Sequence, residues 1–346
     1  MEAVAAQNGH LVKASRLAQA EYYASLYARM PIVDLGRIGP GYGRILAICG
    51  GGHIDASFKN LLGVGLLLLA HERGILRSGQ TIVESTSGSL GQGLAVACRI
   101  LDHPAVLVSD RNLPSITRRK IELLGARLVL VEAPHPDLGW QQAREDKVRE
   151  LLNEHVDWYW TDQNNTSLNP EVYTRWLVPE LAAALDASCI NVNAAVFGVG
   201  SGGHFVALAR WLKSRNSLVR TYAADRIGSI TFGADPGPSR IRGIGNQNIV
   251  PRIIADNIGL VDGIEYVEDR EAFEFARRLA ADGLFVGGSS GLILAAAVRV
   301  ARKHPEVDVL TLFPDRGELY HDTLWSDEWM RGAHAGRPVQ AFRPIG

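Results

Sequence analysis

Short apolar runs alternate with helical patterns along most of this chain, and this alternation constrains the fold more than any other feature of the sequence. The expected strands are 44–49, 81–84, 105–109, 127–131, 194–199, 219–224, 264–267 and 307–313, with a further short strand leading into Gly287. The expected helices are 11–29, 59–74, 90–101, 114–124, 138–155, 171–185, 205–215, 249–257, 270–282 and 292–303. Strands separated by helices of about ten or more residues pair in parallel through right-handed crossovers. The sequence therefore predicts an α/β fold with mostly parallel sheets that carry helices on both faces.

A polar stretch at 162–170 interrupts the alternation and is the expected crossing between two domains. The chain of 346 residues is long enough for about two domains. We predict an N-terminal α/β domain at 1–165, a C-terminal α/β domain at 166–330 and a tail at 331–346. The sequence leaves open whether residues 30–49 pack with the other domain.

Charge and composition argue against two classes of partner. A net charge of -1 leaves no basic surface for nucleic acid or for an anionic membrane. The longest apolar run, 64–70, is far shorter than the roughly 20 residues that cross a bilayer, and no signal pattern is seen, so we expect a cytoplasmic protein. Cys49, Cys98 and Cys189 are widely spaced in apolar stretches and are expected to be small core residues. The ten histidines show no spacing typical of a metal site, so we predict no catalytic metal.

One lysine stands at an unusual place in this pattern. Lys59 follows the glycine-rich turn Gly50–Gly52 and opens a helix whose next turns, 64–70, are apolar. A helix start carries positive partial charge, so burial and the helix dipole both lower the pKa of an amine placed there. A neutral lysine is a nucleophile that forms imines with carbonyl compounds. The alternative interpretation is an ordinary surface lysine after a turn.

Three polar or glycine-rich loops follow expected strands, where ligands bind in open parallel sheets. The first, Glu84–Gly91, offers hydroxyls and main-chain N–H groups that suit a carboxylate, unless one of its serines only caps the next helix. The second, Gly198–His204, precedes a helix, so its amides suit a phosphate. The third, Gly288–Gly291, opens another helix and offers a hydroxyl to a ring nitrogen of a cofactor, unless that serine is also a cap.

The second loop also matches the dinucleotide fingerprint G-x-G-x-x-G, with Gly198, Gly200 and Gly203 in register and Asp225 at the end of the next strand. An NAD-dependent oxidoreductase is therefore one alternative function. A dinucleotide site gives no role to Lys59 or to the third loop. An imine-forming lysine, a phosphate loop, a hydroxyl for a ring nitrogen and a carboxylate loop together describe a pyridoxal 5'-phosphate site.

With these segments in this order, the sequence resembles the cysteine synthase family, the β-substituting pyridoxal-phosphate enzymes of fold type II that include cystathionine β-synthase and the 2,3-diaminopropionate synthases. The resemblance runs from about Met30 to Met330. The matching segments are Glu84–Gly91, Gln163–Pro170, Gly198–His204, Gly288–Gly291 and Pro314–Tyr320, which are similar in turn to the family's Glu-Pro-Thr-Ser-Gly-Asn-Thr-Gly, Gln-Phe-x-Asn-Pro-x-Asn-Pro, Gly-Val-Gly-Thr-Gly-Gly-Thr, Gly-x-Ser-Ser-Gly and Gly-Glu-Arg-Tyr signatures. The resemblance implies two three-layer α/β domains with the cofactor in the cleft between them, and a homodimer.

The resemblance also implies roles for individual residues. Lys59 would form the imine with the cofactor and remove the α-proton of the substrate. The implied cofactor-binding residues are Lys59, Ser89, Gly200, Ser201, Gly202, Gly203, His204 and Ser289, with 200–204 on the phosphate and Ser289 on the pyridine nitrogen. The implied residues for the substrate carboxylate are Thr86, Ser87, Gly88 and Gln163. Because a serine hydroxyl is a poor acid, the pyridine nitrogen is expected to stay unprotonated, unless Asp315 lies close to the ring.

Departures from the family pattern indicate a specialised reaction. Ser89 stands where the family has the asparagine that contacts the ring hydroxyl, His204 replaces the last threonine of the phosphate loop, and Leu90 replaces a threonine of the carboxylate loop. The resemblance implies β-replacement on an activated L-serine of the O-phosphoserine or O-acetylserine type, through an aminoacrylate, to give a β-substituted alanine. The partners would be this amino acid and a second small nucleophile.

The long glycine-rich loop at 226–252 bears on the choice of donor. Its arginines Arg226, Arg240, Arg242 and Arg252, with Arg316 in the carboxyl-terminal signature, suit a phosphate, although they are equally typical of a solvated surface. They favour O-phosphoserine or another activated serine and the 2,3-diaminopropionate synthase branch. An ordinary cysteine synthase that uses sulfide, and a catalytically silent homologue that binds a partner, stay open as alternatives.

Overall fold

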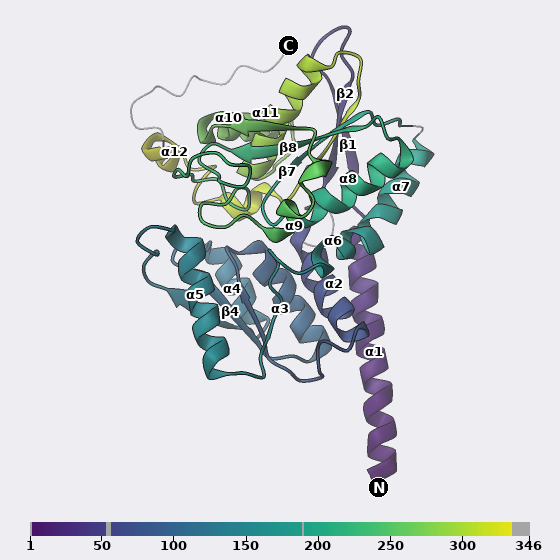
Figure 1. Ribbon diagram of the computed structural model, residues 1–346, viewed down its shortest axis with the longest axis vertical. Coiled ribbons are helices and arrows are strands. Elements are labelled where there is room, and N and C mark those ends of the chain that lie inside the picture. The colour runs from purple at the N-terminus through teal and green to yellow at the C-terminus, as the bar shows by residue number, and fades with distance from the viewer. Residues whose placement is uncertain (1, 53–56, 189, 334–346) are drawn as a thin grey trace. The chain divides into compact units, whose positions relative to one another are not determined.

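A computed structural model describes residues 2–52, 57–188 and 190–333, and for residues 2–14 it describes the main chain alone. The helices and strands form two compact units (Figure 1). The first unit comprises Met1–Arg29 and Lys59–Val172, and the second comprises Met30–Phe58 and Tyr173–Gly346. The chain therefore passes from the second unit to the first immediately before Lys59. The predicted domains at 1–165 and 166–330 stay a prediction.

The first unit contains a four-stranded parallel sheet with the strand order β5-β4-β3-β6. Its strands are β3 (Ile82–Ser85), β4 (Ala105–Asp110), β5 (Arg127–Val131) and β6 (Tyr159–Trp160). Its helices are α1 (Glu2–Ala28), α2 (Lys59–Glu72), α3 (Ser89–Leu101), α4 (Ser115–Leu123), α5 (Gly139–Glu154) and α6 (Leu168–Val172). Helix α5 packs on the sheet through a cluster of Val83, Val106, Val108, Val148 and Leu151.

The second unit contains a six-stranded sheet with the order β1-β2-β10-β7-β8-β9, in which only the β1–β2 pair is antiparallel among the described strands. Its strands are β1 (Ile32–Arg37), β2 (Arg44–Cys49), β7 (Ala194–Gly198), β8 (Arg220–Arg226), β9 (Gly263–Val267) and β10 (Val309–Phe313). Its helices are α7 (Val178–Ala187), α8 (Gly203–Arg215), α9 (Arg252–Ala255), α10 (Asp269–Ala281), α11 (Gly288–Lys303) and α12 (Asp327–Ala333).

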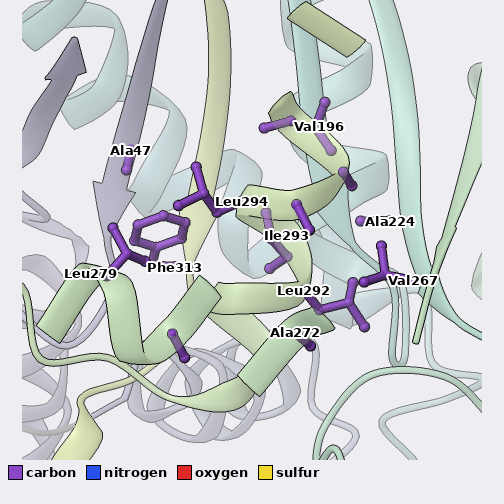
Figure 2. Close-up of a cluster of buried hydrophobic side chains, with 14 of the residues drawn as sticks. Ala47, Val196, Ala224, Val267, Ala272, Leu279, Leu292, Ile293, Leu294 and Phe313 are labelled. Carbon is purple, nitrogen blue, oxygen red and sulfur yellow. The ribbon is translucent and has the colours of Figure 1, made fainter. Parts of the chain in front are cut away.

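Helices α8 and α11 lie on opposite faces of the second sheet. Successive residues of a strand point to opposite faces. Val196 of β7 belongs to the core that α11 covers, whereas the ring of Phe197 lies 6.3 Å from the ring of Phe205 in α8. Figure 2 shows part of the α11 side, where Leu292 and Ile293 belong to a cluster of buried side chains that includes Val196. This sheet thus forms the middle of three layers, with each face covered by helix.

The expected α/β class with mostly parallel sheets is confirmed, but several elements differ from the expectations. The edge strand β1 was not expected, because it is half exposed and lacks a buried apolar run. The expected helix 171–185 is divided by a π-helical turn at Tyr173–Leu177 ahead of Pro179, whose missing N–H disrupts helical hydrogen bonding. Val286 makes only an isolated bridge, so no strand leads into Gly287, and the helix expected at 249–257 is limited to α9.

Two smaller expectations concern cysteines and membranes. Cys49 and Cys98 are buried in the apolar core, as expected, and Cys189 lies outside the described residues. Within the described parts of the chain, no helix combines the length and the apolar character needed to cross a membrane.

Candidate active site

Two glycines fix the position of Lys59 in the first unit. Helices α2 and α3 cross at Gly63 and Gly93, where a β-carbon added to Gly63 would lie 2.3 Å from the carbonyl carbon of Gly93. A β-carbon on Gly93 would lie 2.7 Å from the main-chain oxygen of Lys59. Since no side chain fits at either position, the two glycines allow the first turn of α2 to lie directly against α3.

The amine of Lys59 lies beside the side-chain amide of Gln163. Lys59 Nζ donates a hydrogen bond to Gln163 Oε1 at 3.1 Å, and Gln163 Nε2 donates to the main-chain oxygen of Ser85 at 3.3 Å. Asn169 Nδ2 donates to the main-chain oxygen of Gln163 at 2.7 Å and holds that segment in place. Burial lowers the pKa of the Lys59 amine to about 8. An amine with this pKa is partly neutral near neutral pH and is available as a nucleophile or a base.

A buried carboxylate, Glu84, lies next to Gln163 at the end of β3. Glu84 is 2% exposed. It accepts hydrogen bonds from Ser85 N at 2.8 Å, Gln163 N at 3.3 Å, Trp160 Nε1 at 3.3 Å and the Thr161 hydroxyl. Burial raises the pKa of Glu84 to about 7, while the negative charge of Glu84 acts to raise the pKa of Lys59. No role for Glu84 was predicted from the sequence, although an acidic residue that ends an apolar strand is a signal of a buried charge.

Thr86 shapes the loop between β3 and α3. Its hydroxyl oxygen accepts hydrogen bonds from the main-chain N–H groups of Gly88 and Gly91, both at 3.0 Å. Gly88 is the first residue before α3 and has φ of 145°, and it provides no side-chain cap. The alternative interpretation required a serine side chain to cap this helix, and no serine does so. Ser87 is exposed and Ser89 is half-buried at the first position of α3.

The expected phosphate loop joins β7 to α8 in the second unit. Gly202 caps α8 in a left-handed conformation with φ of 87°, which favours glycine. Ser201, Gly203 and His204 are buried. The first N–H groups of a helix lack acceptors within the helix and point outward from its start, so they suit an anion.

Residues 243–254 pack against the expected phosphate loop. A β-carbon on Gly200 would lie 2.5 Å from the main-chain oxygen of Gly243, and one on Gly202 would lie 2.3 Å from the side chain of Ile254. Asn246 Nδ2 donates to the main-chain oxygen of Gly200 at 3.1 Å. Asn246 is buried and also donates to the hydroxyl of Thr231 at 3.0 Å. The glycines of the phosphate loop are thus required by close packing, and Asn246 fixes the orientation of one of its peptide groups.

The side chain of His204 packs among aromatic rings. Its ring centroid lies 5.1 Å from Phe58, 5.9 Å from Tyr173 and 6.4 Å from Phe197, each at a steep angle. Phe58 is the residue that precedes Lys59 in the chain. The substitution of a histidine for the family's threonine therefore adds packing at the start of α8 and against the residue next to the lysine.

Ser289 lies at the start of α11 near a buried acidic residue. Gly287 precedes the helix without a side-chain cap, and Ser289 is 3% exposed. A β-carbon on Gly287 would lie 2.3 Å from Asp315 Oδ1, so this carboxyl group lies against the start of α11. Tyr320 donates its hydroxyl to Asp315 Oδ2 at 2.8 Å, and burial raises the pKa of Asp315 to about 7. A carboxyl group therefore accompanies Ser289 at this helix start. Its presence bears on the expectation that the pyridine nitrogen stays unprotonated, which held unless Asp315 lies close to the ring.

Asp225 is unsuited to bind the ribose of a dinucleotide. It is fully buried at the end of β8, and its Oδ1 accepts from the main-chain N–H of Arg226 at 2.8 Å. A β-carbon on Gly245 would lie 2.9 Å from the same oxygen. Burial raises the pKa of Asp225 to about 6. The arrangement disfavours the NAD-dependent alternative.

The arginines singled out for the donor have partners within the second unit. These are the main-chain oxygens of Ile227 and Gly237 for Arg226, the ring of Trp329 for Arg240, Asp256 for Arg252 and Glu318 for Arg316. Arg242 is half-buried and close enough to Tyr320 for its charge to act on the pKa of that hydroxyl.

The predicted site residues are divided between the two units. Within the first unit the structure brings Lys59 and Gln163 into contact, and places Thr86, Ser87, Gly88 and Ser89 in one loop ahead of α3. Within the second unit it places Gly200, Ser201, Gly202, Gly203 and His204 at the start of α8 and Ser289 at the start of α11. The role of each residue stays a prediction. Glu84, which contacts Gln163, and Asn246, which contacts Gly200, were not predicted from the sequence.

Comparisons of the sequence with known proteins agree on one family. A model of the family described as "Pyridoxal-phosphate dependent enzyme" matches residues 24–315. The chain is 33% identical over 276 residues to the N-(2-amino-2-carboxyethyl)-L-glutamate synthase of Ralstonia nicotianae, which covers 78% of this chain and 80% of the relative. It is 34% identical over 266 residues to the cysteine synthase of Helicobacter pylori, which covers 76% of this chain and 84% of the relative.

A solved structure is similar over nearly the same extent. The crystal structure of the O-acetylserine dependent cystathionine beta-synthase from Helicobacter pylori matches with a TM-score of 0.79 and 30% sequence identity. The match covers 87% of this chain and 96% of the solved chain. The similarity thus extends through both compact units.

Proposed function

Because the chain belongs to the family of pyridoxal-phosphate-dependent enzymes, we propose that it replaces the β-substituent of an activated L-serine, of the O-phosphoserine or O-acetylserine type, to give a β-substituted alanine. The cystathionine beta-synthase compared above is named for its dependence on O-acetylserine, and the Ralstonia relative for a glutamate that carries a 2-amino-2-carboxyethyl group on nitrogen. The single observation that carries the proposal is the Lys59 amine, with a pKa of about 8, held by Gln163 beside the loop that Thr86 shapes.

The residues of the chain suit the cofactor. When bound, pyridoxal 5'-phosphate supplies an aldehyde for imine formation and a conjugated ring that delocalises negative charge from the α-carbon of an amino acid. Lys59 would hold the aldehyde carbon, and residues 200–204 would hold the phosphate through main-chain N–H groups at a helix start. The glycines at 200 and 202 support this assignment, because any side chain there would collide with Gly243 or Ile254 and displace the loop. Ser289 would donate its hydroxyl to the ring nitrogen, and Ser89 would face the ring hydroxyl.

We assign the proton transfers to Lys59. Once the amino group of the substrate has taken its place, Lys59 Nζ would be a free, neutral amine that takes the proton from the α-carbon and becomes an ammonium group, whose hydrogen bond Gln163 Oε1 would accept. The bond between the β-carbon and the leaving group then breaks, the nucleophile forms a bond to the same carbon, and Lys59 returns the proton to the α-carbon. Thr86, Ser87, Gly88 and the Gln163 amide N–H would hold the substrate carboxylate throughout.

Arg242 bears on the identity of the donor. O-phosphoserine would place a phosphate near the β-carbon, and a guanidinium group binds phosphate with two parallel hydrogen bonds. We therefore favour O-phosphoserine or another activated serine over O-acetylserine. With purified enzyme, Arg242→Ala is expected to raise the KM for O-phosphoserine about tenfold or more and to leave that for O-acetylserine nearly unchanged. Equal effects on both donors would remove this preference.

The proposed reaction is tested by mass spectrometry of the product. The holoenzyme is incubated separately with O-phosphoserine and O-acetylserine, each with sulfide or with an amino-acid amine as nucleophile. A β-substituted alanine is expected from at least one pair. Rapid formation of cysteine from O-acetylserine and sulfide alone would identify an ordinary cysteine synthase. Cofactor binding without any product from these pairs would favour the catalytically silent alternative.

We further propose a cytoplasmic homodimer. The near-neutral net charge and the absence of a long apolar run in the sequence support the location, and family resemblance supports the dimer. Sedimentation or light scattering is expected to give twice the chain mass of 37.6 kDa. A mass of one chain at micromolar concentration would contradict the dimer.

A further inference from the structure

Glu84 is buried beside Lys59, the proposed base, but it takes no part in the proton transfers assigned to that lysine. Its Oε1 faces two N–H groups, those of Ser85 and Trp160, and its Oε2 faces the Gln163 N–H and the Thr161 hydroxyl. N–H groups only donate, so these contacts favour the charged carboxylate over the neutral acid. The fold of the first unit therefore provides this buried carboxylate with hydrogen-bond donors for both of its oxygens.

Gln163 connects this carboxylate to the lysine. The main-chain N–H of Gln163 donates to Glu84, and its side-chain oxygen accepts from Lys59 Nζ at 3.1 Å. We propose that Glu84 is a positioning residue for Lys59: it fixes the segment that carries Gln163, and its negative charge favours the ammonium form of Lys59 and so makes the amine a stronger base. The inference rests on the proposed function only for the source of the proton, the α-carbon of the substrate.

The charge balance is simple. One proton moves from the substrate α-carbon to Lys59 Nζ and later returns, while Glu84 stays ionised and neither gains nor loses a proton. Without Glu84, burial alone would disfavour the ammonium group and weaken the base. Because burial raises the pKa of Glu84 to about 7, its support of Lys59 is present above that pH and is lost as the pH falls below it.

Other titratable groups of the first unit interact electrostatically with Glu84 or with its neighbours. The charge of Asp162 also acts on Glu84, and both carboxylates raise the pKa of Tyr159. From α5, Arg149 acts on Asp162 with the opposite sign, and Glu145 is affected by both Asp162 and Arg149. Of these groups, Glu84 is the one whose charge acts on Lys59.

The test measures the protonation of Lys59 directly, without catalysis. The full-length chain, freed of cofactor, is labelled with an amine-reactive reagent at pH values from about 6 to about 10, and labelling of the Lys59 peptide is quantified by mass spectrometry. In Glu84→Gln, which keeps the side-chain volume and removes the charge, the midpoint is expected to fall by about one pH unit. Glu145→Gln removes another buried carboxylate of the same unit and is expected to leave the midpoint unchanged. A folded Glu84→Gln variant with the wild-type midpoint would overturn the inference.

A second variant keeps the test decisive if Glu84→Gln does not fold. Thr161→Val keeps the shape of the side chain and removes one donor to Glu84, so the pKa of Glu84 rises further and the Lys59 midpoint is expected to fall by a smaller amount. In the holoenzyme, kcat for Glu84→Gln is expected to fall at least tenfold, with KM little changed, and Glu84→Asp is expected to recover part of it. A lowered Lys59 midpoint in a chain that forms no β-substituted alanine would uphold this inference and contradict the proposed function.

Discussion

We propose two tasks for Lys59, imine formation and proton transfer, and its amine is suited to both because burial lowers its pKa to about 8. The environment of this residue is made by neighbours that are distant in sequence, namely Gln163 and the Gln163-bound Glu84. The sequence predicted the lysine and the glutamine from their motifs. It did not single out Glu84, because the burial of a carboxylate at a strand end depends on what packs over it.

Lys59→Ala is expected to lower kcat by a factor of about 10³ or more, because both the imine and the base are lost. The variant should keep its fold and part of its affinity for pyridoxal phosphate, since the phosphate loop is a separate segment. Steady-state kinetics and circular dichroism check the two statements, with Lys147→Ala, a half-buried lysine paired with Glu150, as the control. Near-normal turnover in Lys59→Ala would exclude the proposed mechanism.

Asp315 provides a prediction about pH. Burial raises the pKa of this carboxyl group to about 7, so the folded chain favours its neutral form. The contribution to stability is complete below the ordinary pKa of 3.8 and decreases as the pH rises through about 7. Asp315→Asn keeps an acceptor for Tyr320 and removes the titration, so its stability relative to wild type should increase between about pH 4 and about pH 7, by at most about 4 kcal/mol.

Thermal unfolding of both proteins across that pH range measures this difference. Asp235→Asn, which changes an exposed carboxylate, should show no such trend. A difference between Asp315→Asn and wild type that does not vary with pH would mean that Asp315 is charged in the folded chain throughout the range.

At the level of secondary structure, the site depends on two close approaches that glycine permits. The α2–α3 crossing requires Gly63 and Gly93, and the proposed phosphate loop requires Gly200 and Gly202. Sequence motifs predicted the second pair, because a glycine-rich turn between a strand and a helix is a recognisable pattern. They did not predict the first pair, since a glycine inside a helix gives no indication of the helix that it meets.

Gly93→Ala is expected to move the start of α2, because the added carbon would lie 2.7 Å from the Lys59 main-chain oxygen. The overpacking should cost about 1–3 kcal/mol of unfolding free energy and reduce kcat more than KM. Chemical denaturation and steady-state kinetics measure the two effects. Gly259→Ala adds a methyl group where no atom lies within 4 Å and serves as the control. Unchanged kcat in Gly93→Ala would show that the crossing does not determine the position of Lys59.

Asn246→Ala is expected to weaken cofactor binding about tenfold, because the peptide of Gly200 loses the hydrogen bond that orients it. Fluorescence titration of the cofactor-free chain with pyridoxal 5'-phosphate measures this affinity. Gln247→Ala removes a hydrogen bond to Gly237 in the same loop, away from Gly200, and should bind the cofactor normally. Equal losses in the two variants would indicate a general loosening of the loop instead of a specific role for Asn246.

For the whole molecule, periodicity was sufficient to predict the α/β class and most strands, because buried parallel strands such as β7 and β10 are short runs of mostly apolar residues. It failed for β1, whose residues are half exposed and whose pairing with β2 is antiparallel. It also failed for the contact of Asn246 with Gly200, because a loop without periodicity carries no signal about what it packs against. The five motifs predicted the family, while the supporting side chains could be found only in the structure.

The most direct test of the central claim is to locate the lysine that binds the cofactor. The purified holoenzyme is reduced with borohydride, digested and analysed by peptide mass spectrometry. The account predicts that the reduced phosphopyridoxyl group is attached to the peptide that contains Lys59, and that the visible absorption of the protein disappears on reduction. Attachment to a different lysine, or a protein that carries no reducible cofactor after reconstitution with pyridoxal 5'-phosphate, would contradict it.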